Sequence, residues 1–194
     1  YEKTYLLASN QFKTFFETYG RSTLAQEAYF MYAYSQFVSS PDSNLDQKSS
    51  LEAMAAMQNF LNRFPNSTFR EKAIEVINAS QQKLEAKGFE NARQYLKIKM
   101  YKAAVIAFDN FKKAYPDSKY LEEIAYLKIV SQYRYALASF QHLQTERYTN
   151  VVNYYQEFVD AYPNSSFLKD AEKMYSESQA QLSKLKSIKP NKPS

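Results

Sequence analysis

The chain has 194 residues, of which 45% are hydrophobic and 23% charged, values typical of a soluble globular protein long enough for a sizeable core. It contains two glycines, no cysteine and one histidine, His142. So few glycines argue against phosphate-binding loops and β-turns, and this cysteine and histidine content excludes thiolate catalysis and histidine-based zinc sites. We therefore predict an all-α protein that is not an enzyme, with no catalytic residues, no metal site and no cofactor.

The net charge is +5, from 25 basic and 20 acidic residues. Residues 184–194 hold four lysines and no acid, so the rest of the chain is close to neutral and shows no basic stripe for a nucleic-acid backbone. We expect no nucleic-acid partner and a basic, disordered tail over residues 188–194. No run approaches the ~20 apolar residues that a membrane-spanning helix needs. Because the sequence begins at Tyr1 rather than at Met, we expect any signal sequence or membrane anchor upstream of it.

A short pattern recurs four times along the chain. Each copy has Phe, three residues, an aromatic residue, Pro (Gly in the first copy), any residue and Ser. Proline cannot continue a helix and pushes its predecessor out of the α region, and a serine two residues later is a good N-cap for the next helix. The pattern therefore predicts the end of one helix and the start of another. The copies are residues 15–22, 60–67, 111–118 and 158–165.

The first half of the chain begins with a helix that ends at the first copy. We interpret it as the second helix of an incomplete repeat, and we expect a further upstream helix, or a partner, to cover its apolar face. A polar loop over residues 39–48 then lengthens the next connection. Residues 67–99 form an almost unbroken helical pattern, which predicts one long helix with Gly88 as its weak point.

In the second half, Ala104, Phe108 and Phe111 share one face of a helix that ends before Pro116, and Ser118 is the expected N-cap of its successor. That successor is predicted as a second long helix over residues 120–143, with a turn at 144–147. The whole pattern predicts a superhelix of about four repeats plus a C-terminal helix, in a single helical-repeat domain over residues 1–187.

The repeat resembles tetratricopeptide repeats (TPRs), best over residues 85–116, where Ala92 and Tyr95 fall at the small and aromatic positions of the first helix. The irregular spacing resembles one TPR family, the outer-membrane-assembly lipoprotein BamD, in the form found in Bacteroidota. The more specific stretches are Ser40-Pro-Asp-Ser-Asn-Leu-Asp-Gln47 and, 42 residues after that loop, Phe89-Glu-Asn-Ala.

The resemblance implies a five-repeat periplasmic protein held at the outer membrane by an acylated cysteine upstream of this sequence. It implies a BamA-like insertase as partner, contacted through that protein's periplasmic POTRA module within about residues 89–182, together with other subunits of the assembly complex. It also implies a part in receiving unfolded β-barrel precursors. A stand-alone periplasmic TPR adaptor of the cell-envelope or division machinery is the alternative function.

Four residues are candidate partner contacts because the first helix of each TPR lines the concave surface. In the best-matched repeat the groove-facing positions are occupied by two apolar and two basic residues: Phe89, Arg93, Leu96 and Lys97. Such a set suits an extended peptide with apolar side chains and an acidic group, or a helix laid in the groove. Phe89 and Leu96 are equally well explained as core residues. His142 is interpreted as a core or helix-end residue rather than a catalytic base.

Overall fold

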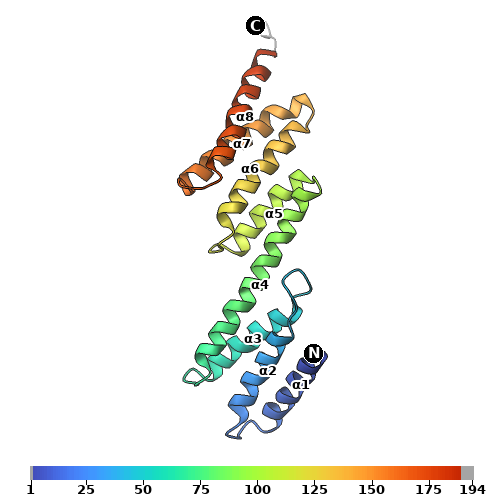
Figure 1. The fold of residues 1–194 in the computed structure, drawn as a ribbon, viewed down its shortest axis with the longest axis vertical. Helices are drawn as coiled ribbons and strands as arrows, with labels where there is room; N and C mark the ends of the chain where they lie inside the picture. The colour runs from blue at the N-terminus through green and yellow to red at the C-terminus, as the bar shows by residue number, and fades with distance from the viewer. Residues whose placement is uncertain (1, 189–194) are drawn as a thin grey trace, which may run out of the picture. The chain divides into compact units, whose positions relative to one another are not determined.

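The structure, a computed structural model, describes residues 2–188, and within them it consists of helices joined by turns and loops, without strands (Figure 1). The all-α fold of consecutively paired helices predicted from the repeat is confirmed. The described helices are α1 (Glu2–Thr18), α2 (Ala25–Ser39), α3 (Lys48–Arg63), α4 (Arg70–Lys97), α5 (Tyr101–Ala114), α6 (Leu121–Leu137), α7 (Gln141–Ala161) and α8 (Leu168–Ile188).

The contacts divide the chain into two compact units, Tyr1–Lys87 and Gly88–Ser194. The first unit holds α1 to α3 and most of α4, and the second holds the end of α4 and α5 to α8. The single domain over residues 1–187 stays a prediction. The predicted tail over residues 188–194 lies outside the described residues except for Ile188, where α8 ends.

The four serines of the repeated pattern all accept a backbone hydrogen bond where the next helix begins. The Ser118 hydroxyl accepts from the Tyr120 N–H at 3.3 Å, while its carbonyl accepts from Leu121 N–H at 3.2 Å. The predicted acceptor role is therefore confirmed, but the N-cap of α6 is Tyr120 and not Ser118. The serine closes a tight turn that precedes the helix. The corresponding hydroxyl–amide distances are 3.2 Å for Ser22, 3.1 Å for Ser67 and 3.1 Å for Ser165.

Equivalent positions of the repeat form the core of each unit. In the first unit, α3 buries Ala53, Met57 and Phe60 completely, against α2 and the start of α4. In the second unit, α5 buries Ala104 and Phe108 in the same way. Small residues at the first position let the helices approach closely, and the aromatic rings fill the space that remains.

Gly88 faces two aromatic rings, Phe111 in α5 and Tyr115 just after it. A Cβ at this position would stand 3.1 Å from Cε2 of Tyr115 and 3.4 Å from the Phe111 ring. The predicted long helix over residues 67–99 is confirmed as α4, which continues through Gly88. This glycine is therefore explained by the lack of space beside the two rings.

The loop between α2 and α3 follows the prediction and is fixed to α4 by two lysines. Lys83 Nζ donates to Ser40 Oγ at 2.7 Å, and Lys87 Nζ donates to the carbonyl oxygen of Leu45 at 2.8 Å. Within the loop, Gln47 Nε2 donates to the carbonyl oxygen of Asp42 at 2.7 Å. The stretch that distinguishes the resembling family therefore has a defined local structure.

The prediction of a second long helix over residues 120–143 is wrong in its extent, because α6 ends at Leu137 and α7 begins at Gln141. The turn predicted at 144–147 lies inside α7. Side chains fix the actual turn: Arg147 donates to the Ser139 hydroxyl, and Gln144 Nε2 donates to the Ser139 carbonyl at 3.1 Å. Pattern analysis placed the break at the wrong residues because this turn contains neither glycine nor proline.

Tyr133 links two first helices of neighbouring repeats, α6 and α8. Its hydroxyl donates to a carboxylate oxygen of Glu177. Burial raises the pKa of Tyr133 above its ordinary value, and the hydrogen bond to Glu177 and the charge of that residue raise it further. The neutral phenol is therefore the form that the folded protein favours.

Candidate protein-binding surface on helix α4

All four predicted contact residues lie in the C-terminal part of α4, within the second unit. They occupy one side of the helix but differ in exposure. Phe89 exposes only 4% of its surface and Leu96 packs, partly buried, against the same core cluster. The side chains of Arg93 and Lys97 expose 36% and 54%. The structure therefore divides the set into two residues that pack and two that face outward.

Phe89 belongs to the core. Its ring stacks on Tyr120 with 4.4 Å between centroids and an interplanar angle of 12°, and it meets Phe111 edge-on at 6.3 Å. A ring so placed holds α4 against its neighbours, and no face of it is left for a partner. Phe89 was predicted as a direct partner contact. Its burial instead agrees with the alternative interpretation, that it is a core residue.

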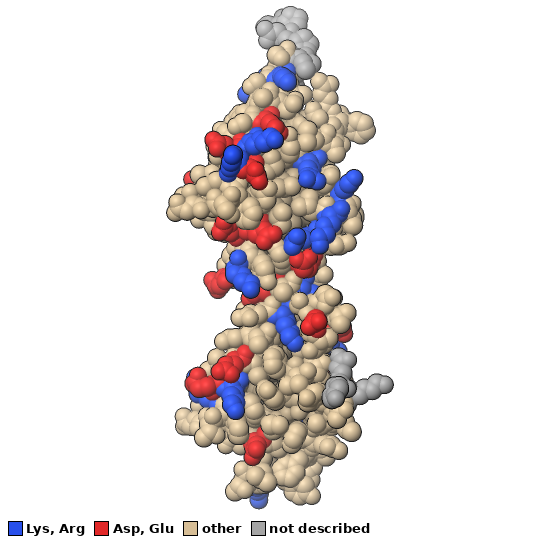
Figure 2. All heavy atoms as spheres, in the orientation of Figure 1, with Lys and Arg blue, Asp and Glu red and all other residues tan. Residues whose placement is uncertain are grey.

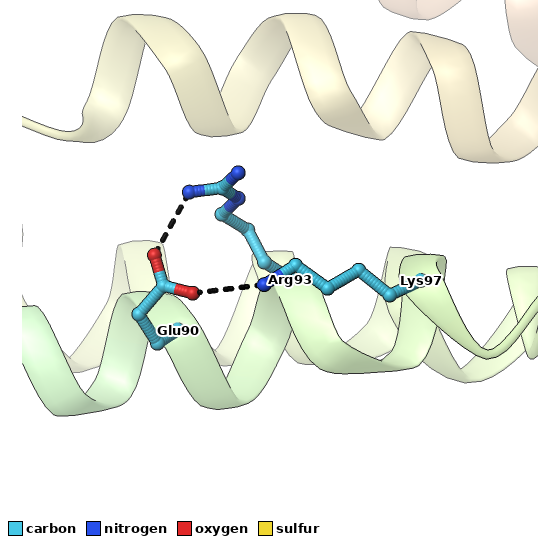
Figure 3. Close-up of polar contacts among 3 residues, drawn as sticks. All are labelled: Glu90, Arg93 and Lys97. Atoms are coloured by element: carbon cyan, nitrogen blue, oxygen red, sulfur yellow. Dashed lines mark hydrogen bonds and ion pairs between the residues drawn. The ribbon is translucent and has the colours of Figure 1, made fainter. Parts of the chain in front are cut away.

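Arg93 and Lys97 share one acidic residue, Glu90, which the sequence analysis overlooked (Figure 3). Arg93 Nη1 lies 2.8 Å from Glu90 Oε1, and Lys97 Nζ lies 3.3 Å from Oε2 of the same carboxylate. The Arg93 guanidinium also lies 5.3 Å from the Phe89 ring centroid, within reach of a cation–π interaction. The signal was available in the sequence, because Glu90 precedes Arg93 by three residues, a spacing that brings side chains together on a helix.

This arrangement presents a pre-positioned pair of cations. The three groups carry one net positive charge, and ion pairs this exposed contribute only about 0 to 1 kcal/mol to stability. Glu90 can therefore be exchanged for a carboxylate of a partner at little cost. Phe89 and Glu90 keep the Arg93 guanidinium in place until then, which limits the entropy lost on binding.

A groove in the first unit was not foreseen. This groove lies between α2 and the first half of α4, and among its lining residues Phe30 stacks on Phe69 with ring centroids 4.7 Å apart. Lys72 and Glu75 contribute the charges of the groove. The sequence of α2 could have indicated this groove. That helix is apolar on nearly all sides, as expected of a helix that is covered on more than one face. The lining residues of the groove are Phe30, Met31, Tyr34, Phe37, Phe69, Lys72, Glu75, Val76 and Ala79.

Other kinds of site find less support in the described part of the chain. His142 lies exposed in the first turn of α7 with its ring stacked on Phe140, which agrees with a helix-end histidine. Among residues 2–188, no group of three or more His, Asp and Glu side chains is arranged to hold a metal ion. No helix in that range is both long and apolar enough to cross a membrane.

Comparison with known proteins identifies the family. The model of the YfiO family, described as outer membrane lipoprotein, matches residues 1–119, more than half of the chain. The protein belongs to the YfiO family. No curated protein matches it.

The YfiO match covers α1 to α5 and ends just before α6. It therefore includes the loop pinned by Lys83 and Lys87, the groove between α2 and α4, and the Glu90–Arg93–Lys97 cluster. The helices beyond residue 119 are related to the rest by the internal repeat, since Val151 and Phe158 are buried like Ala104 and Phe111. Both candidate surfaces thus lie in the part of the chain that the family describes.

Proposed function

We propose that this protein is a BamD-type scaffold of the outer-membrane β-barrel assembly machinery, of the form found in Bacteroidota. In this proposal it is lipid-anchored at the periplasmic face of the outer membrane and binds the POTRA module of a BamA-like insertase and other assembly subunits. The observation that carries the proposal is the YfiO family match over residues 1–119. A helical-repeat fold with exposed, pre-positioned cations supports a binding function, because such folds present extended surfaces to partners.

The insertase would be bound through Arg93 and Lys97. A carboxylate on the POTRA surface replaces Glu90 and forms charge-assisted hydrogen bonds with the two cations. Leu96, half-buried beside them, supplies an apolar contact at the edge of the site. Phe89 acts from below as support for Arg93.

The groove between α2 and α4 would receive the precursor. Strands of outer-membrane barrels alternate apolar and polar side chains, so an extended precursor presents a row of apolar side chains on one face. The aromatic lining of the groove suits such a row, and Tyr34, which is 39% exposed, is placed to contact it.

The insertase proposal is tested by titrating a purified POTRA module into the protein and its variants. We expect Arg93→Ala and Lys97→Ala to weaken binding by roughly 5- to 30-fold, the range of interface residues that matter. Glu90→Gln should strengthen it, since the cations then lose their internal competitor. Lys48→Ala is the matched control, because it removes a similar helical ion pair, with Glu52, outside the proposed surface.

The result decides between the two functions given above. The insertase proposal would be refuted if neither this chain nor a chain extended to the complete N-terminus bound the POTRA module. That result would favour the stand-alone envelope adaptor. A complete N-terminus without a lipidation signal would favour the adaptor too.

The precursor groove is tested separately with an extended peptide of alternating aromatic and polar residues. Tyr34→Ala should weaken its binding by roughly tenfold, whereas Tyr5→Ala, at a tyrosine of 40% exposure on α1, should leave it unchanged. Equal effects of the two substitutions would contradict the assignment of the groove.

A further inference from the structure

Two turns of the second unit lie on the same edge of the repeat. Since α4, α5, α6 and α7 alternate in direction, the α4–α5 turn and the α6–α7 turn come to the same side, as Figure 1 shows. Large apolar side chains project from both turns: Ile98 and Met100 are each 52% exposed, Leu137 is 51% exposed and Phe140 is 79% exposed. We call Tyr95, Ile98, Lys99, Met100, Lys102, Leu137 and Phe140 the turn edge.

The turn edge is also basic. Between Glu90 and Asp109 the chain has four cations and no acid. In Figure 2 lysine and arginine side chains gather where α4 ends and α5 begins. Arg134 adds an exposed cation at the end of α6, and Glu146, in α7, is the acid nearest in sequence to the second turn. Lys99 and Lys102 belong to the first turn and the start of α5, whereas Arg93 and Lys97 lie in the end of α4 and pair with Glu90.

The opposite edge of the same unit has neither the exposed apolar side chains nor the excess of positive charge. Its turns, residues 115–120 and 162–167, contain one acid and one base, Asp117 and Lys119. The aromatic rings there, such as Tyr115 and Phe167, pack partly buried against the core clusters. Exposed apolar side chains and unbalanced positive charge are therefore both concentrated on the turn edge.

Lys99 occupies a backbone position where a side chain is costly. Its φ of 62° lies in the left-handed region. The Met100 N–H donates to the Tyr95 carbonyl at 2.9 Å and the Lys99 N–H to the Leu96 carbonyl at 3.0 Å, the hydrogen bonds of a Schellman C-cap. Glycine is the usual residue at this position, so a lysine here places a cation at the tip of the turn against the backbone preference.

We propose that the turn edge binds the surface of an anionic phospholipid membrane. Lys99 and Lys102 would meet headgroup phosphates, while Ile98, Met100 and Phe140 enter the boundary of the acyl chains. The side chains project from two separate turns and are largely exposed, which suits a fluid interface better than a shape-matched protein surface. Apolar burial combined with basic residues is the pattern of membrane-surface binding. The family is described as one of outer membrane lipoproteins, so a membrane is within reach.

The proposed membrane contacts, Lys99 and Lys102, differ from the proposed insertase contacts, Arg93 and Lys97, which lie earlier on α4. Membrane binding would give an anchored protein a second attachment point and thereby fix which of its faces is turned toward the periplasm. We expect attachment to weaken as the ionic strength rises and to require anionic lipid.

The test uses the 194-residue chain without any acyl group in a vesicle flotation assay. Vesicles of phosphatidylethanolamine and phosphatidylglycerol should bind it at low ionic strength, and vesicles of phosphatidylcholine alone should not. The double substitution Lys99→Asn and Lys102→Gln should lower the partition coefficient about 30-fold, because each basic residue near an anionic surface contributes roughly fivefold. Phe140→Ser should lower it further, and with Phe140 79% exposed this variant folds.

The matched control is Lys112→Gln with Lys113→Gln, which removes two exposed cations at the other end of α5. Binding of the control variant should equal that of the unsubstituted protein. An equal loss in both double variants would overturn the proposal, as would equal binding to neutral vesicles or no binding at low salt. If the turn-edge substitutions instead weaken POTRA binding and leave vesicle binding unchanged, the surface belongs to a protein partner.

Discussion

The left-handed conformation of Lys99 allows a stability prediction with an unusual sign. A non-glycine residue in this region costs about 1 to 2 kcal/mol. Replacement by glycine removes that cost but raises the conformational entropy of the unfolded chain, which offsets about 0.5 to 1 kcal/mol. We therefore expect Lys99→Gly to raise the free energy of unfolding by about 0.5 to 1 kcal/mol, although the substitution removes a side chain.

Urea unfolding followed by helical circular dichroism measures this difference. With a urea dependence of about 2 to 3 kcal/mol per molar, the midpoint should rise by roughly 0.3 M. Lys112→Gly is the matched control: it removes the same charge from an exposed residue of α5, at a helical position, and should cost about 0.5 to 1 kcal/mol. The two variants thus differ in sign.

The same variant separates stability from membrane attachment. Lys99→Gly should lower vesicle partitioning about fivefold while the protein becomes more stable. A lower midpoint for Lys99→Gly than for the unsubstituted protein would refute the reasoning, because it would mean that the lysine side chain holds the turn together.

Three further predictions concern the core, the helix starts and alkaline pH. Phe108→Ala should cost about 3 to 5 kcal/mol because its ring is fully buried, whereas Phe140→Ala, 79% exposed, should change stability by less than about 0.5 kcal/mol in the same urea titration. Ser118→Ala should cost about 1 kcal/mol, the usual value for a lost acceptor at a helix start, measured by thermal unfolding. The pKa of Tyr133 is higher in the folded than in the unfolded protein, so its contribution is complete below about pH 10 and is lost as the pH rises through the folded-state pKa. Tyr133→Phe should therefore reduce the loss of stability as the pH rises above about 10, and an unchanged pH dependence would show that folding does not raise the pKa of Tyr133.

The repeat made much of the fold predictable. Pro116 and its equivalents mark helix ends in the sequence itself, and the 4-3-4 spacing of Ala104, Phe108, Phe111 and Tyr115 identifies the buried face of α5. Both are local signals, so no tertiary information was needed. The C-terminal boundary of α6 could not be found in this way, because Arg147 and Gln144 fix the turn at Ser139 from the following helix.

The candidate site was less predictable, because exposure on a helix depends on what packs against it. Periodicity placed Phe89 and Arg93 on the same side of α4, yet Tyr120 covers Phe89, while Arg93 faces outward and pairs with Glu90. The groove beside α2 depends in the same way on how α2 and α4 approach each other. Sequence spacing gives the side of a helix, and only the neighbouring helices decide which residues on that side reach a partner.

The use of glycine shows how packing and charge compete in this chain. Gly88 stands in mid-helix, where glycine is unfavourable by about 1 kcal/mol, and a Cβ there would crowd the Tyr115 ring at 3.1 Å. At residue 99 the backbone itself favours glycine, and the chain carries lysine instead. Close packing favours glycine at the first position, whereas at the second no backbone gain accompanies the lysine. The lysine at the tip of this exposed turn therefore stands against the backbone preference, and the proposed membrane contact gives its charge a role.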